Sequence, residues 1–185
     1  MRCFLPSLLT GTLALTLVAC DATSPSAPDL GPGAFEAVVA SPDSEVTLGG
    51  VASASLSAED AAFDGTFGSY VVAETDDGTS YTFSSIELRA DSGEEILLGT
   101  VAPGDGLASG AYGIETSRNL DAPFDFVVLY DADGASGRGG SAAARANAGA
   151  VEIDVDGDRV SGTFDLTFED GLSVSGSFNA APADA

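Results

Sequence analysis

The chain has 185 residues, with 29 acidic residues against six basic ones and a formal net charge of −23. It contains no histidine, and every basic residue is an arginine. These absences exclude Ser-His-Asp and Cys-His catalysis, His-ligated zinc, lysine Schiff bases and a P-loop. Such an acidic chain is also a poor partner for duplex nucleic acid, which needs clustered Lys and Arg. Carboxylate, hydroxyl and arginine chemistry is left, and we expect no cofactor.

The first nineteen residues have the form of a signal peptide. Arg2 precedes a short apolar run, and small residues stand before the expected cleavage site, a pattern typical of a secretory signal rather than of a spanning helix. The run ends in Leu17, Val18, Ala19 and Cys20, which match the bacterial lipobox. This match predicts a lipoprotein signal peptide over residues 1–19 and acylation of Cys20. The alternative is an ordinary signal peptide cut near Ala19, with Cys20 incidental.

Residues 20–33 hold three prolines among small polar residues, which predicts a flexible tether that does not pack. The likeness to lipoproteins implies a diacylglycerol thioether on Cys20, often with an amide-linked chain, such as palmitate. Two or more acyl chains hold a protein stably at a bilayer, whereas one holds it only marginally. We therefore expect the protein in the cell envelope, bound to a bacterial membrane through its N-terminal lipid. Which membrane and which leaflet stay open.

Residues 34–180 read as a single β-domain, followed by a short tail at 181–185. Asp-Gly pairs at 64–65, 77–78, 105–106 and 133–134 mark turns between strand candidates. The candidates are residues 35–40, 46–56, 66–74, 80–89, 95–101, 111–116 and 124–130. Residues 141–147 are rich in Ala and Arg, but seven residues are too few for an independent helix, so we expect a strand or loop there.

Residues 149–180 show the clearest periodicity. Apolar and polar residues alternate over 151–155, 160–168 and 172–178, which indicates strands with one buried and one solvent-facing side. Asp156-Gly157 and Asp170-Gly171 separate these runs and predict type I′ turns, which need positive φ at both central residues. About ten strands without an amphipathic helix predict an all-β fold, either an antiparallel β-sandwich or a partly closed barrel.

The same third of the chain resembles a known group of sequences. Residues 149–153, 158–167 and 172–178 follow the pattern G-t-v-x-I, r-v-s-G-t-F-x-f-t and v-x-v-x-G-x-F, which is similar to a group of uncharacterised bacterial β-rich lipoproteins. Residues 110–112 resemble another step of that pattern. The group has no established activity, so the resemblance implies no catalytic or binding residue. Gly162 and Gly176 precede Phe164 and Phe178 by two positions, which leaves room on one sheet face for an aromatic neighbour.

Asp154, Asp156 and Asp158 are weak candidates for a calcium site, because alternating carboxylates on a tight turn suit a hard cation. An EF-hand loop starting at Asp154 would need glycine at position 159 and glutamate at 165, which are Arg159 and Asp165. A hairpin turn with surface acids explains the same residues, and we predict no metal.

We expect a non-catalytic structural or binding domain. One alternative is a carrier of an apolar ligand in a barrel interior, lined by the phenylalanines and by Tyr70, Tyr81, Tyr112 and Tyr130. Another is a carboxylate-only glycoside hydrolase, which needs two facing acids, drawn from pairs such as Glu94-Glu95 or Asp76-Asp77. From Cys20 onward five arginines face 29 acids, a formal charge of −24. An acidic, lysine-free folded chain is typical of a halophilic protein.

Overall fold

A computed structural model describes residues 30–58, 81–104, 106–116, 124–133 and 143–183 of the chain. In these residues ten strands form one sheet in the order β5-β8-β9-β10-β1-β2-β3-β4-β6-β7. The elements are β1 Ala34–Ser41, β2 Ser44–Ala58, β3 Tyr81–Ala90, β4 Glu95–Pro103, β5 Gly110–Gly113, β6 Phe124–Asp131, β7 Ala144–Arg145, β8 Ala148–Asp156, β9 Arg159–Thr167, a 3-10 turn at Glu169–Gly171, and β10 Ser173–Pro182. The all-β prediction is confirmed.

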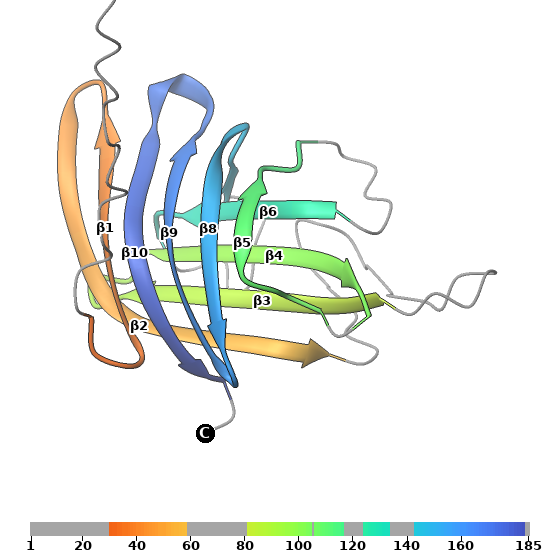
Figure 1. The fold of residues 1–185 in the computed structure, drawn as a ribbon. Helices are drawn as coiled ribbons and strands as arrows, with labels where there is room; N and C mark the ends of the chain where they lie inside the picture. Colours follow the sequence, from red (N-terminus) through yellow and green to blue (C-terminus); the bar gives the residue numbers. More distant parts are fainter. Residues whose placement is uncertain (1–29, 59–80, 105, 117–123, 134–142, 184–185) are drawn as a thin grey trace, which may run out of the picture.

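The sheet folds over on itself into two layers (Figure 1). Strands β5, β8, β9, β10 and β1 lie side by side in one layer, and β3, β4 and β6 cross them in the other. Strand β2 belongs to both layers, because residues 44–51 pair with β1 and residues 50–58 pair with β3. Neighbouring strands in the order are antiparallel, and the end of β10 adds a short parallel contact with β2. Among the described residues, an isolated bridge between Ile114 and Phe126 connects the two ends of the strand order. Hydrogen bonds from Ala146 N to Val128 O and from Asn147 N to Thr167 O also connect them, but the sheet is not closed.

A glycine of β2 allows a close approach of β3. At Gly50 an added Cβ would overlap the carbonyl oxygen of Arg89 on β3 and come within 2.9 Å of the Ala90 Cα. Only a residue without a side chain lets the β3 backbone approach this closely. The adjacent Gly49 has ordinary space, with its nearest neighbour 3.7 Å from an added Cβ. Gly50 thus lies where the two layers separate along one strand.

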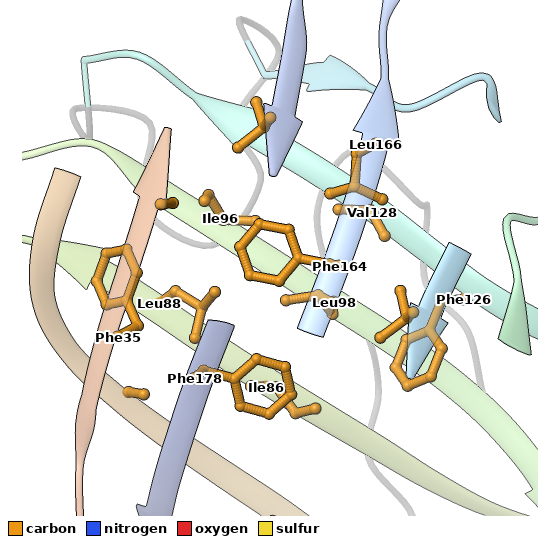
Figure 2. Close-up of a cluster of buried hydrophobic side chains, with 14 of the residues drawn as sticks. Phe35, Ile86, Leu88, Ile96, Leu98, Phe126, Val128, Phe164, Leu166 and Phe178 are labelled. Atoms are coloured by element: carbon orange, nitrogen blue, oxygen red, sulfur yellow. The ribbon is translucent and has the colours of Figure 1, made fainter. Parts of the chain in front are cut away.

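The hydrophobic core lies between the layers (Figure 2). Phe164 and Phe178 stack with ring centroids 6.4 Å apart and face Ile86, Leu88 and Leu98 of the other layer. The expected aromatic neighbour is present at Gly162, which pairs with Phe178 and where an added Cβ would lie 3.0 Å from that ring, but the nearest contact of such a Cβ is the Glu152 carbonyl oxygen of β8.

Gly176 likewise lies against the backbone of an adjacent strand. An added Cβ there would meet the Glu36 carbonyl oxygen and the Ala37 side chain of β1. The close approach of β1, rather than an aromatic ring, gives the nearest contacts at this position.

Most predicted strands are present with shifted ends. The three-stranded meander is confirmed as β8, β9 and β10. Residues 141–147, where we expected a strand or loop, include the two-residue strand β7. The strand expected over 111–116 is shorter and shifted, as β5. The strand predicted over 66–74 and the Asp-Gly pairs at 64–65 and 77–78 lie outside the described residues, as do Asp105 and Gly134 of the other two pairs.

The two Asp-Gly turns of the meander differ. Asp156 pairs with Arg159, so the loop is Gly157-Asp158, and only Gly157 has positive φ, at 67°. Glycine first in a two-residue loop is the type II′ pattern, so the type I′ prediction was wrong here because the strand extends through Asp156. Asp170 and Gly171 have φ of 61° and 76°, and Leu172 N donates to Glu169 O at 3.4 Å. That turn has the predicted type I′ form.

Strands β4 and β6 are buried on both sides. Ile96, Leu98 and Val128 face the core, while Leu97 and Leu129 pair on the opposite side and are 3% and 2% exposed. Two-sided burial is unusual for antiparallel strands, which commonly face water on one side. It places the acidic ends of these strands, Glu95 and Asp131, in a buried setting as well.

Candidate functional site

The chain enters the described domain at Leu30, beside its C-terminal end. The Asn179 side chain donates from Nδ2 to the Leu30 carbonyl oxygen at 2.9 Å, and Gly33 N donates to Asn179 O at 2.6 Å. Ala52 N donates to Gly33 O at 2.9 Å, which ties the entering chain to β2. Residues 30–33 of the predicted tether are therefore fastened to β10 and β2.

The lipid-anchor residues Leu17, Val18, Ala19 and Cys20 lie outside the described residues, so their predicted roles stay predictions. The predicted tail is partly ordered structure: β10 runs to Pro182, and Ala183 N donates to Ala54 O at 2.9 Å. Both chain ends of the described domain are thus held at the same place, next to the middle of β2.

Asp154, Asp156 and Asp158 lie at the end of β8 and in the β8–β9 turn. Asp154 Oδ1 accepts a hydrogen bond from Ser109 Oγ at 3.2 Å, and Val155 N donates to the same hydroxyl at 2.8 Å. Asp156 stands opposite Arg159 across the hairpin. Within the part of the chain that the structure describes, no three or more acidic or cysteine side chains are grouped to hold a metal ion. The contacts that these residues do make fasten the loop before β5 to the end of β8.

Glu94 and Glu95 are a candidate acid pair of adjacent residues. Glu95 lies on the outer side, 6% exposed, with an oxygen 3.8 Å from Arg89 Nη2. The Glu94 carboxylate lies near Tyr130, which is on the core side. Glu94 precedes β4 and Glu95 begins it, and the two carboxylates have different neighbours, so these two acids do not form a facing catalytic pair. Asp76 and Asp77 are outside the described residues.

Sequence reasoning missed the burial of Glu95 and Asp131. They stand directly opposite each other on β4 and β6, each 6% exposed, and Asp131 Oδ1 accepts from Asp133 N at 3.0 Å. Arg89 is 3.8 Å from Glu95 and 4.0 Å from Glu87. In the sequence, Glu95 and Asp131 stand at the boundaries of the apolar runs that form β4 and β6, which is the only local sign of their burial. The strand register then places the two acids opposite each other.

The aromatic residues proposed to line a ligand cavity pack against other aromatic residues. Tyr112 meets Phe126 edge to face at 5.3 Å, and its hydroxyl donates to Ala108 O at 2.8 Å. Tyr130 meets Phe168 at 6.1 Å. Burial raises the pKa of Tyr130 above its usual value, and the charges of Glu94 and Asp131 add to the effect. Tyr70 is outside the described residues, and the Tyr81 side chain is not described.

The fold and these contacts define an all-β domain built on one folded-over sheet, entered at Leu30. The described residues include no helix long and apolar enough to cross a membrane. Comparison of the chain with protein-family models, with curated proteins and with solved structures gives no match.

Proposed function

We propose that the protein is a lipid-anchored, non-catalytic β-domain of the bacterial cell envelope, with a structural or binding role. The observation that carries the proposal is the sequence Leu17-Val18-Ala19-Cys20 at the end of a signal-like segment. The signal-like segment indicates export, and Cys20 would then be modified with lipid. The described part of the chain begins ten residues later, at Leu30.

The non-catalytic part of the proposal is supported by how the described acids are used. Glu94 lies near Tyr130 whereas Glu95 lies beside Arg89, and Asp154 accepts a hydrogen bond that holds a loop in place. Function has to be argued from a site rather than from a fold. The packed contacts of Tyr112 and Tyr130 give the apolar-ligand alternative no support from the described residues.

Metabolic labelling tests the anchor. Cells that express the full chain are fed a palmitate analogue, and the protein is examined for label and for the mass of its N-terminal peptide. We expect label on the wild type, none on Cys20→Ala, and full label on the matched variant Cys3→Ala, since Cys3 leaves with the signal peptide. An unlabelled wild-type protein cut near Ala19 would refute the proposal.

A further inference from the structure

The point at which the chain enters the domain selects one end of the sheet. Strand β1 begins next to Leu30, and in the antiparallel order β10 ends there, β9 begins there and β8 ends there. We call this end the anchor rim: residues 30–33, the β8–β9 turn at 156–159, and residues 179–183. At the opposite end, the far rim, lie the β1–β2 turn at Pro42 and Asp43 and the turn Glu169–Gly171 (Figure 1).

Chain length limits how far the anchor rim can lie from a lipid on Cys20. The ten residues from Cys20 to Leu30 span at most about 36 Å when fully extended. A flexible linker of ten residues has a root-mean-square span of only about 16–19 Å. The far rim is farther along the strands, because β1 has eight residues and a strand rises about 3.3 Å per residue, which adds about 25 Å. The hydrogen bonds from Asn179 and Gly33 hold the entry point, so the tether cannot lengthen by peeling residues 30–33 away without breaking them.

From these constraints we propose that the anchor rim is the surface that faces the lipid bilayer, and that the far rim points away from it. This inference rests on the proposed acylation of Cys20. The β8–β9 part of the anchor rim carries exposed Asp156 and Asp158 beside one arginine, Arg159. Charged side chains are costly to place in hydrocarbon. The anchor rim therefore lies over the lipid headgroups, held there by the tether rather than by insertion.

Two matched positions report on the two rims. Asp158 and Asp43 are both exposed and both occupy the second position of a two-residue hairpin loop. Asp158→Cys and Asp43→Cys remove the same charge. Each adds the only free thiol of the mature protein, because Cys20 is acylated and Cys3 is removed. A fluorescent maleimide then marks either rim without touching the core.

The labelled, acylated full-length mature protein is placed in phosphatidylethanolamine–phosphatidylglycerol vesicles that carry a headgroup-attached quencher. We expect quenching at position 158 to be at least twofold stronger than at position 43. Equal quenching, or stronger quenching at position 43, on a protein whose mass shows acylated Cys20 would overturn the orientation alone. A protein without the acyl mass would overturn the proposed function, and the orientation with it.

Discussion

At the scale of single residues, burial and nearby charges act on the hydroxyl of Tyr130. It is 9% exposed, pairs with Ile96 of β4 and contacts Phe168. Burial disfavours the tyrosinate, and the negative charges of Glu94 and Asp131 disfavour it further, so the pKa lies above 10.0 in the folded protein. The neutral hydroxyl is the form that the folded state accommodates.

This perturbation predicts an alkaline loss of stability. The pKa of Tyr130 is higher in the folded protein than in the unfolded chain. The stability that the neutral Tyr130 hydroxyl contributes is therefore fully present below the unfolded pKa near pH 10, and it is lost as pH rises through the folded pKa. We expect the free energy of unfolding of the wild type to fall above pH 10, and Tyr130→Phe to make that fall smaller. Urea denaturation at several pH values between 8 and 11 measures both.

The matched control for this prediction is Tyr112→Phe. It removes a hydroxyl that bonds Ala108, at a cost of about 1 kcal/mol. That cost should lower stability at every pH and leave the alkaline fall in place. If Tyr130→Phe and the wild type lost stability equally above pH 10, the assignment to Tyr130 would be wrong.

At the scale of elements, β2 is the strand on which the architecture depends. It has 15 residues and pairs first with β1 and then with β3, so it carries the chain from one layer into the other. The close approach of β3 at Gly50 leaves no space for a side chain, whereas Gly49, one residue earlier, has space. These adjacent glycines give a direct test of that close approach.

Alanine substitutions at the two positions should have different effects on stability. Gly50→Ala forces the β3 backbone to move and should destabilise the fold by about 1–3 kcal/mol or more. Gly49→Ala meets no close neighbour and should be neutral or stabilising by about 0.4–1 kcal/mol, because it reduces the freedom of the unfolded chain. Denaturant midpoints of the two variants measure the difference. Equal destabilisation by both would contradict the close approach of β3 at Gly50.

At the scale of the whole molecule, the chain has a net charge of −23, and in the described strands acids are rarely paired with acids. Among the paired strand residues that the structure describes, only Glu95 and Asp131 are two acids directly opposite each other, and Arg89 lies beside Glu95. Several other acids face a small or hydroxyl residue, as Glu36 faces Ser177 and Glu152 faces Thr163, while Asp156 faces Arg159. Most repulsion between carboxylates in the described strands therefore acts over distances longer than that between directly opposite residues.

Repulsion at that range predicts salt-dependent stability. Diagonal neighbours on a sheet are about 7–8 Å apart, and the Debye length falls from about 8 Å at 0.15 M to about 3 Å at 1 M. We expect the melting temperature to rise as sodium chloride increases from 0.05 to 1 M, by about 2–4 °C for each kcal/mol regained. Sulfate at matched ionic strength should raise it further, because excluded salts strengthen apolar burial. A flat melting temperature up to 2 M would refute the halophilic interpretation.

The sequence by itself determined the elements whose signals are local. The alternation of apolar and polar residues over 151–178 predicted three strands, because each of these strands has one buried and one solvent-facing side. Asp170-Gly171 predicted a turn because few residues tolerate positive φ. The lipobox on Cys20 is local in the same way, though it lies outside the described residues.

Only the tertiary structure decided what depends on distant segments. The folding of one sheet into two layers follows from β2 pairing with both β1 and β3, which no local pattern encodes. Strands β4 and β6 lose their solvent-facing side, and the burial of Glu95 and Asp131 follows from that and from strand register. Asn179 meets Leu30 across 149 positions of sequence. Burial and register are set by contacts between remote residues, whereas turn and strand signals are set by neighbours.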